Sequence, residues 1–351
     1  MNVLVTGGGG FLGRRITEML LDRGDHVRVF GRHHYEAVEQ LGAEGCVGDI
    51  RDGEATREAG IGAEAVIHCA ALAGVWGRRR DFYGVNVRGT ANVINCCLEN
   101  RIRTLVHTSS PSVAIGEDDI EGADESLPYP KRYLAHYPAS KAKAEQMVLE
   151  ADGWEMVVEN KSFGAPGGVD STVTVLRTCA IRPHLIWGPG DPHLVPRMLE
   201  TAKAGRLRRV GPGTNRVDMT YVDNAAHAHL LALDNLRSTQ QAGGKAYFVG
   251  DEQPVSLWPW INDLLEELRV APVTRNISFG AARRVGAIME GIYTVCPCLG
   301  EPRMTRFVAT QLAKSHFFSH ERAANDLGYK PIVDAETAMS RTLDWLRTRP
   351  E

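Results

Sequence analysis

The chain has 351 residues, 24% of them charged, and a formal net charge of -3 at pH 7. This length allows about two domains or one large α/β unit. A net charge this close to zero gives no electrostatic basis for binding nucleic acid, so we expect no nucleic-acid partner.

The first predicted element is a buried strand over residues 3–5, and a glycine-rich turn and an apolar helical pattern follow it. Three glycines match the T-G-x-x-G-x-x-G form of the dinucleotide-binding fingerprint. They permit a tight turn, a close approach of the backbone to a pyrophosphate, and close packing of the helix on the strand. The first residues of the helix offer unpaired N–H groups to the phosphates. The predicted cofactor contacts here are Gly7, Gly10, Phe11, Leu12 and Gly13.

Strand-like runs and helical patterns then alternate through the first half of the chain. Further strands are predicted at residues 26–30, 66–68, 104–107 and 173–176. A long helix is predicted with one face formed by Val87, Ala91, Ile94 and Leu98. Between residues 152 and 171 the pattern breaks down, and residues 160–168 look like a surface loop. The alternation predicts a parallel sheet covered by helices on both sides.

The chain beyond residue 183 alternates less regularly, and helical patterns dominate it. We expect an α/β protein with a Rossmann-type, doubly wound parallel sheet and a smaller, mainly helical C-terminal substrate lobe. The dinucleotide-binding domain is expected to cover residues 1–183, with residues 216–250 returning to it. The substrate-binding lobe is expected to cover residues 184–215 and 251–351.

Residues 277–299 form an apolar stretch of this lobe that carries Arg283, Arg284 and Glu290. These charges argue against a membrane span and predict an amphipathic helix. The helix could pack within the protein or touch lipid. A peripheral contact with a membrane or with a pathway enzyme therefore stays open.

The seven cysteines lack the spacing of a disulfide framework, and Cys296 and Cys298 have no second pair or histidine cluster near them in the sequence. No metal site is therefore expected. No signal-peptide pattern precedes the first strand. Together with the cysteine usage, this predicts a cytoplasmic protein.

Tyr137 and Lys141 are the second feature that carries chemistry. Residues four positions apart on a helix lie on one face, so both side chains can reach a single site. A phenol with its ordinary pKa of about 10 exchanges protons poorly at neutral pH. We expect the lysine cation to favour the phenolate and to lower the pKa of Tyr137, which makes it a usable acid and base.

Together with the glycine turn and a hydroxyl-rich run after the fourth predicted strand, this pair resembles the extended short-chain dehydrogenase/reductase family. The resemblance covers nearly the whole chain. It implies that Ser110, rather than its neighbour Ser109, hydrogen-bonds the substrate oxygen beside Tyr137. It also implies that Lys141 holds the nicotinamide ribose.

Further marks of this family lie along the chain. The resemblance implies that residues 48–50 and the residues after the strand at 66–68 approach the cofactor, and that Asp49 approaches the adenine. It also implies a homodimer built through the helices over residues 86–100 and 137–150. The remaining implied cofactor contacts are Asp49, Ile50, Ala70, Ala71 and Pro183.

The residues after the second strand predict the choice of cofactor. NAD-selective relatives end this strand in a carboxylate that accepts hydrogen bonds from the ribose 2′-OH. Here Gly31, Arg32 and two histidines follow the strand. Because no carboxylate repels it, a 2′-phosphate can pair with the forked guanidinium of Arg32, and we expect NADP(H).

Within the family, residues 183–196 resemble the 3β-hydroxysteroid and sterol-4-carboxylate dehydrogenase branch. Residues 73–77 and 186–191 are similar to bacterial 2-alkyl-3-oxoalkanoate reductases of long-chain olefin biosynthesis. These likenesses imply the NADPH-dependent reduction of an apolar β-keto acid to the hydroxy acid. The implied substrate contacts are Trp76, His184 and Trp187. A partner for the substrate carboxylate is expected among His184, Arg78, Arg79 and Arg80.

Sugar-nucleotide members of the family carry an R-D-[FY] motif before a Y/H-V-x-D element, and the arginine of this motif binds the diphosphate. At the matching position this chain has Val217, with Arg216 one residue away. A buried diphosphate without a paired cation is costly. A sugar-nucleotide substrate is therefore not expected.

Two other functions stay open. The chain could be an NAD(P)-dependent 3β-hydroxysteroid or sterol-4-carboxylate 3-dehydrogenase, which shares the ketone–alcohol chemistry. It could instead be a nucleotide-sensing protein without turnover, because a fold alone does not prove activity. Such proteins usually lack the tyrosine and lysine that this chain has.

Overall fold

A seven-stranded parallel sheet forms the centre of the computed structural model, which describes residues 1–160 and 170–348. Neighbouring strands in it all run parallel. In order across the sheet they are β14 (Lys245–Val249), β9 (Arg177–Pro183), β5 (Thr104–Thr108), β4 (Ala65–His68), β1 (Asn2–Thr6), β2 (His26–Gly31) and β3 (Glu44–Val47). The strands predicted at residues 26–30, 66–68 and 104–107 are thus confirmed. The strand order reverses between β1 and β4, where such a sheet binds ligands beyond its carboxyl ends.

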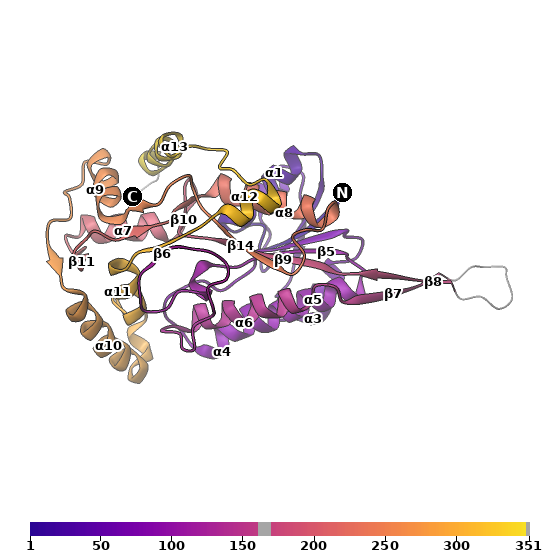
Figure 1. The fold of residues 1–351 in the computed structure, drawn as a ribbon, viewed down its shortest axis with the longest axis horizontal. Coiled ribbons are helices and arrows are strands. Elements are labelled where there is room, and N and C mark those ends of the chain that lie inside the picture. The colour runs from indigo at the N-terminus through magenta and orange to yellow at the C-terminus, as the bar shows by residue number, and fades with distance from the viewer. Residues whose placement is uncertain (161–169, 349–351) are drawn as a thin grey trace.

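Helices cover both faces of the sheet, which confirms the predicted doubly wound α/β fold (Figure 1). α1 (Phe11–Asp22) and α8 (Val222–Arg237) lie on one face. α3 (Gly53–Ala59), α5 (Gly89–Glu99) and α6 (His136–Glu150) lie on the other. Alternate residues of β1 serve the two layers, because Val3 and Val5 join one hydrophobic core and Leu4 joins the other. The other helical segments of this half are α2 (Glu36–Glu39), α4 (Arg79–Phe82), the π-helix η1 (Tyr83–Arg88) and the 3-10 helix η2 (Pro111–Val113).

The strand predicted at residues 173–176 is wrong as a strand of the main sheet. Asp170–Val175 forms β8, which pairs antiparallel with β7 (Glu155–Asn160) in a hairpin that projects from the body of the protein (Figure 1). The segment that enters the sheet is β9. A run of β-branched residues predicts a strand but does not show whether that strand is buried. Here the strand lies outside the core, because the Val173 side chain is 55% exposed. Residues 161–168 of the predicted loop lie outside the described residues.

The C-terminal region is mainly helical, as predicted. Its helices are α7 (Leu194–Lys203), α9 (Leu257–Glu267), α10 (Phe279–Val295), α11 (Arg306–Ala313), α12 (Glu321–Leu327), α13 (Ala335–Thr348) and the 3-10 helix η3 (Pro297–Leu299). Two short strand pairs join them, β10 (Ile186–Trp187) with β13 (Thr220–Tyr221) and β11 (Arg209–Val210) with β16 (Asn276–Ile277). A four-stranded sheet consists of β15 (Val255–Ser256), β12 (Arg216–Val217), β17 (His316–Phe318) and β6 (Ile120–Ala123). Because β14 pairs with β9 and α8 covers the main sheet, we propose that residues 216–250 return to the domain formed by residues 1–183.

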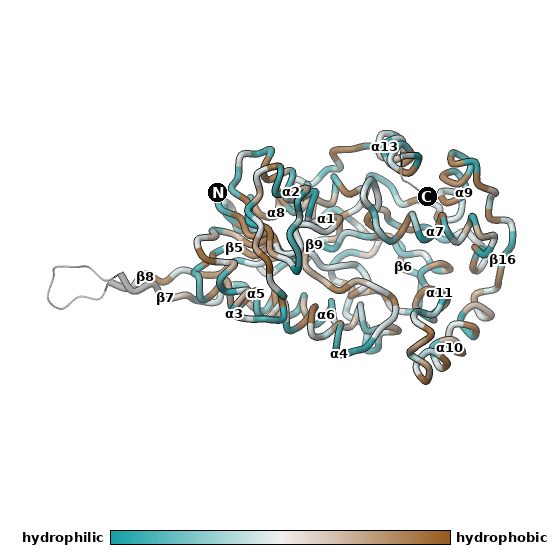
Figure 2. The backbone as a smooth tube through the Cα atoms, turned by 180° about the vertical axis from the view of Figure 1, so that it is seen from behind, coloured by the Kyte–Doolittle hydropathy of each residue, from teal (hydrophilic) through white to brown (hydrophobic). Residues whose placement is uncertain are grey.

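α10 is the amphipathic helix expected within residues 277–299, and one of its faces packs on α11. A Cβ atom added to Gly286 would lie 2.6 Å from the carbonyl carbon of Thr305. Glu290 accepts hydrogen bonds of 2.7 Å from the backbone and from the guanidinium of Arg306. Another face of α10, at the edge of the lobe in Figure 2, and the turn after it expose Val285, Ile288, Ile292, Val295 and Leu299. No helix within the described residues is long and apolar enough to cross a membrane.

Replacing Gly286 with alanine is expected to lower the free energy of unfolding by about 1–3 kcal/mol, because the new methyl group meets backbone that cannot easily move aside. Gly291 on the same helix is the matched control, since an added Cβ there has no atom within 4 Å. Gly291→Ala should leave stability equal or raise it by up to about 1 kcal/mol. Chemical denaturation measures both values. Equal stability of the two variants would contradict the close packing of α10 on α11.

Candidate active site

The glycine turn between β1 and α1 brings the start of the helix against the end of β4. Gly7 has a φ of +71°, and an added Cβ there would lie 2.9 Å from the backbone of Ala70. A Cβ at Gly13 would overlap the carbonyl oxygen of Gly7. Helix α1 begins at Phe11, and no side chain caps its N–H groups because Gly10 is the preceding residue. The turn therefore fits the pyrophosphate of a dinucleotide.

The ends of β2 and β3 bring together the residues predicted for the adenosine half. Arg51 is the largest cause of the lowered pKa of Asp49, and its Nε lies 3.0 Å from the Asp49 carboxylate. The charge of Arg32, which follows β2, contributes to the same lowering. Arg32 is exposed and forms no salt bridge with the described residues. Ile50, in contrast, is buried, so its side chain packs in the core beneath the segment that carries Asp49 and Arg51.

Asn86 fixes the segment after β4. Its carboxamide accepts a 2.7 Å hydrogen bond from the backbone N–H of Leu72 and donates one of 3.1 Å to the Leu72 carbonyl oxygen. The same amide nitrogen donates to Ser140 Oγ of α6 at 2.9 Å. The predicted cofactor contacts Ala70 and Ala71 therefore lie in a segment that is fastened to α6 beyond the carboxyl end of β4.

Tyr137 lies in the first turn of α6, and the structure brings Ser110 to it. The Ser110 hydroxyl lies near enough to the Tyr137 phenol to lower its pKa. The Ser110 oxygen also accepts hydrogen bonds from Ser112, at 3.2 Å from its backbone N–H and at 2.9 Å from its hydroxyl. Ser109 instead is buried and faces Glu145. Of the two neighbouring serines, Ser110 is thus the one beside Tyr137.

Lys141 lies one turn further along α6 and points into the protein. Its Nζ donates a 2.6 Å hydrogen bond to the carbonyl oxygen of Thr108 and lies 3.1 Å from Nε2 of His107. Lys141 is buried, and this burial lowers its pKa to about 8, although Glu145 opposes the change. Burial also lowers the pKa of His107, so its ring is neutral and its Nε2 can accept the hydrogen bond.

The pKa of Tyr137 differs from the sequence-based prediction. Burial raises the pKa of Tyr137 above the ordinary value, and the nearby Ser110 hydroxyl opposes only part of the increase. The ammonium group of Lys141 is directed at Thr108 and His107, so the expected lowering by a lysine cation is wrong for this structure. Tyr137 is therefore a neutral phenol at neutral pH and holds a proton that it can donate.

A buried ion pair fixes α6 to the sheet below these residues. Arg182 of β9 donates hydrogen bonds of 2.8 and 2.6 Å to Glu145. The Tyr129 hydroxyl donates to the same carboxylate at 2.6 Å. Burial raises the pKa of Glu145, but the charge of Arg182 and these hydrogen bonds outweigh it and hold the pKa below its ordinary value. Glu145 shares a helix face with Lys141, so the ion pair holds that face against the sheet.

α4 and η1 form another side of the site. The rings of Phe82 and Tyr137 meet edge to face, with centroids 6.5 Å apart. The Arg79 guanidinium lies 4.1 Å from the centre of the Tyr83 ring. After burial, the charge of Arg79 is the second cause of the lowered pKa of His136, the residue before Tyr137. Arg79 is thus linked electrostatically to the start of α6.

The other members of the basic run and the tryptophan before it are less constrained. Arg78, Arg79 and Arg80 are all exposed, and Arg80 pairs with Asp81 at 3.3 Å. Trp76 is half-buried in the loop before α4. Pro183 is buried at the end of β9, beside β14. These positions leave Arg79 as the arginine of the run with a link to the residues around Tyr137.

Two predicted substrate contacts lie in the protein core. Trp187 is 2% exposed, and its indole N–H donates to the Asp251 carboxylate at 3.2 Å. His184 is buried, and its Nε2 lies 2.6 Å from Nδ1 of His316. Burial lowers the pKa of His184, so the ring is neutral at neutral pH and offers no charge to a carboxylate. Their roles as substrate contacts stay predictions.

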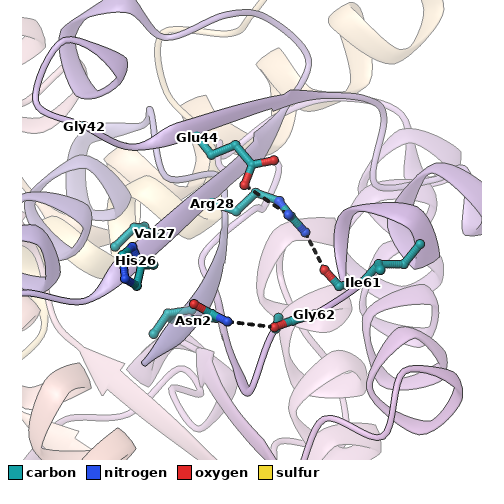
Figure 3. Close-up of a pocket in the computed structure, with 10 residues that line it drawn as sticks. Asn2, His26, Val27, Arg28, Gly42, Glu44, Ile61 and Gly62 are labelled. Atoms are coloured by element: carbon teal, nitrogen blue, oxygen red, sulfur yellow. Dashed lines mark hydrogen bonds and ion pairs between the residues drawn. The ribbon is translucent and has the colours of Figure 1, made fainter.

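The cavity in Figure 3 lies at the opposite end of the sheet from these residues. Asn2, His26 and Glu44, which begin β1, β2 and β3, line it. The guanidinium of Arg28 donates 2.8 Å hydrogen bonds to the carbonyl oxygens of Ala59 and Ile61. It also pairs with Glu44 at 3.0 Å. This cavity is therefore at the amino ends of the strands and not at the dinucleotide-binding edge.

Three residues that the sequence analysis did not single out support the site, namely Ser112, His107 and Glu145. A signal existed for Glu145, because it follows Tyr137 and Lys141 at helical spacing on the same face. Ser112 stands two residues after Ser110, a spacing typical of a hydroxyl in a turn. A histidine within a strand carries no comparable signal, since its partner Lys141 lies far away in the sequence.

Comparisons with known proteins agree on the family and the fold. The sequence matches the 3-beta hydroxysteroid dehydrogenase/isomerase family over residues 4–277. A 2-alkyl-3-oxoalkanoate reductase of Stenotrophomonas maltophilia is 43% identical over 344 residues, which cover 97% of this chain and 98% of the relative. A protein of the same name from Shewanella oneidensis is 42% identical, over 97% of this chain and 85% of the relative.

More distant relatives extend the picture. The sterol-4-alpha-carboxylate 3-dehydrogenase, decarboxylating, of Mus musculus is 32% identical over 97% of this chain and 89% of its own length. Among solved structures, a Thermus thermophilus UDP-glucose 4-epimerase in complex with NAD superimposes with a TM-score of 0.71. It covers 100% of both chains at 22% identity, and this likeness shows the fold alone.

Proposed function

The chain belongs to the 3-beta hydroxysteroid dehydrogenase/isomerase family, and we propose that it reduces a 2-alkyl-3-oxoalkanoate with NADPH to the 2-alkyl-3-hydroxyalkanoate in long-chain olefin biosynthesis. As an oxidoreductase with a nicotinamide cofactor, it acts on a hydroxyl or keto group. One observation carries the proposal. A protonated Tyr137 lies beside Ser110 in a chain that is 42–43% identical to two proteins named 2-alkyl-3-oxoalkanoate reductase.

Tyr137 is the proton donor of the proposed reaction. When bound, the cofactor supplies the hydride that reduces the keto carbon. The keto oxygen then takes the phenolic proton of Tyr137, whose raised pKa keeps that proton in place at neutral pH. Because Ser112 donates to the Ser110 oxygen, the Ser110 hydroxyl is left free to donate to the same keto oxygen.

Lys141 and the glycine turn hold the cofactor in this proposal. Lys141 would bind the nicotinamide ribose, and it is a cation below about pH 8 because burial lowers its pKa to that value. The turn from Gly7 to Gly13 would hold the pyrophosphate, since Gly10 is exposed just before α1 and no side chain caps the helix. His107 and Thr108 fix the lysine ammonium from below.

Arg32 supports the choice of NADP(H) over NAD(H). It is exposed at the carboxyl end of β2 and forms no salt bridge with the described residues, so its guanidinium can bind a 2′-phosphate. Asp49, the nearby carboxylate, is engaged with Arg51. It is therefore less able to compete with the phosphate for Arg32.

The surroundings of β12 support an apolar acid over a sugar nucleotide. Val217 is fully buried at the position of the expected phosphate-gripping arginine. The guanidinium of Arg216 lies 4.8 Å from the centre of the Phe317 ring. Arg216 lines a cavity together with Asp218 and Glu252, and Tyr137 is not among the residues that line this cavity. Arg79 is the candidate for the substrate carboxylate, because its charge reaches the start of α6 beside Tyr137.

The sterol-4-carboxylate 3-dehydrogenase reaction is the second candidate. The mouse relative named for this reaction is 32% identical, and its name also specifies a carboxylate substrate. The retained Tyr137 and Lys141 argue against a nucleotide sensor without turnover. We also propose a cytoplasmic homodimer that meets through residues 86–100 and 137–150.

A panel of substrates tests the proposed function. The purified enzyme should oxidise a 2-alkyl-3-hydroxyalkanoate with NADP⁺, and reduce the corresponding keto acid with NADPH, more efficiently than it converts a 3-hydroxysteroid or a UDP-sugar. Each methylene added to the alkyl chains should raise kcat/KM until the pocket is full, since its burial is worth about 0.8 kcal/mol. Absorbance at 340 nm follows each reaction. Preference for the steroid, or higher efficiency with NADH, would contradict the corresponding part of the proposal.

The variant Tyr137→Phe should lower kcat by about 100- to 10,000-fold, because it removes the proton donor and keeps the ring. NADPH binding, measured by fluorescence, should change little. Tyr133→Phe on the segment before α6 is the control, since its hydroxyl donates only to the carbonyl oxygen of Val113. Turnover of Tyr137→Phe within a few-fold of the parent enzyme would exclude Tyr137 as the acid.

The variant Arg79→Met should raise KM for the keto acid by about 10- to 100-fold, the size expected for a lost charge-assisted hydrogen bond. The methyl ester of the same substrate, which lacks the charge, should be converted with an unchanged KM. Arg80→Met is the matched control, because Arg80 is exposed like Arg79 but pairs with Asp81. An equal change for acid and ester would show that Arg79 does not bind the carboxylate.

A further inference from the structure

The ring of Tyr35 lies across the glycine turn. Tyr35 follows β2 and is the residue before α2. A Cβ atom added to Gly31, the last residue of β2, would lie 2.6 Å from the Tyr35 hydroxyl oxygen. One added to Gly9 would overlap the ring itself. The ring therefore spans the distance from the turn before α1 to the end of β2, and two glycines make room for it.

This position coincides with the path of a dinucleotide. A pyrophosphate at the start of α1 places the adenosine ribose toward the end of β2, where the next side chain meets the 2′ oxygen. Gly9 lies just before α1, and Gly31 lies just before Arg32. A ribose that links these two points passes over both glycines, in the space that the Tyr35 ring fills.

The ring can leave this space while its backbone stays fixed. The carbonyl oxygen of Tyr35 accepts hydrogen bonds from the backbone N–H groups of Val38 and Glu39, at 2.9 and 3.1 Å. Its own N–H donates to the Glu39 carboxylate at 2.9 Å. The Tyr35 hydroxyl has no hydrogen-bond partner in the part of the chain that the structure describes. Rotation of the side chain therefore uncovers both glycines without breaking a hydrogen bond.

We propose that the Tyr35 ring is a cover over the adenosine-ribose subsite, resting on Gly9 and Gly31 in the free protein and turning away when a dinucleotide binds. The inference rests on the dinucleotide binding that the proposed function requires, but not on the keto acid or on the choice of NADPH. The covered protein cannot bind the adenosine half. Its population therefore lowers the apparent affinity in proportion to the uncovered fraction.

Calorimetric titration with 5′-ADP and with 2′,5′-ADP tests the cover. Tyr35→Ala should bind both nucleotides about threefold to tenfold more tightly than the parent protein, because no covered state competes. Tyr35→Phe keeps the ring and should bind like the parent. Gln40→Ala, an exposed change at the end of α2, is the control for general effects on this segment. Equal or weaker binding of both nucleotides by a folded Tyr35→Ala protein overturns the proposal.

A second measurement uses the unaltered sequence, in case Tyr35→Ala does not fold. Protein labelled with 3-fluorotyrosine gives a ¹⁹F signal for Tyr35, which is assigned by its loss in Tyr35→Phe. Saturation with 5′-ADP should shift this signal and raise its relaxation by a soluble paramagnetic agent, as the ring becomes exposed. An unchanged Tyr35 signal at saturation overturns the proposal, as does a failure of both nucleotides to bind. Because no keto acid is present and 5′-ADP lacks the 2′-phosphate, a wrong substrate or cofactor preference leaves these results unchanged.

Discussion

The buried ion pair between Glu145 and Arg182 holds the helix that carries Tyr137 and Lys141 against the central sheet. A buried carboxylate and guanidinium are stable together only when their remaining hydrogen-bonding groups are also used. Tyr129 contributes to this by donating to the same carboxylate. At the other end of the site, Asn86 links α6 to the segment after β4. The helix that carries Tyr137 and Lys141 is thus fixed relative to the glycine turn, which approaches the same segment at Ala70.

Burial acts in opposite directions on the pKa values of Tyr137 and Lys141. It raises the pKa of Tyr137 and lowers the pKa of Lys141, because it disfavours the charged form of each group. The proton is therefore held more firmly by the phenol and less firmly by the ammonium group than in water. Tyr137 therefore carries a proton at neutral pH, and the raised pKa makes its phenol a weaker acid than it is in water. His107 and Thr108 keep the ammonium group away from the phenol.

The residues of the motif at 186–191 mainly form contacts within the protein and not an exposed surface. Trp187 gives its indole N–H to Asp251, and its ring meets the ring of Tyr221 edge to face. The Asp191 carboxylate accepts hydrogen bonds from three backbone N–H groups, those of His193, Leu194 and Val195, at the start of α7. A motif can identify a branch of a family even when its residues are buried, because they form the hydrophobic core that supports a binding site. The hydrophobic character of Trp187 alone did not reveal whether its side chain lies in the core or in a substrate pocket.

Much of the fold could be predicted from local patterns in the sequence. The glycine spacing after residues 3–5 predicted the turn, because only residues without a Cβ fit where the helix start meets Gly7 and Ala70. The strands at residues 26–30, 66–68 and 104–107 were predictable because a buried parallel strand is a short apolar run. The same rule failed at residues 173–176, since a run of β-branched residues does not say which strand it pairs with.

The sequence by itself determined the family, the dinucleotide turn and the spacing of Tyr137 and Lys141 on one helix face, because these depend on neighbouring residues and on helical periodicity. The tertiary structure alone decided what surrounds them. Burial sets the pKa of both groups, and contacts across many residues of sequence direct Lys141 to His107 and seat the Tyr35 ring on Gly9. Such contacts join residues that are distant in the chain, so no local pattern records them.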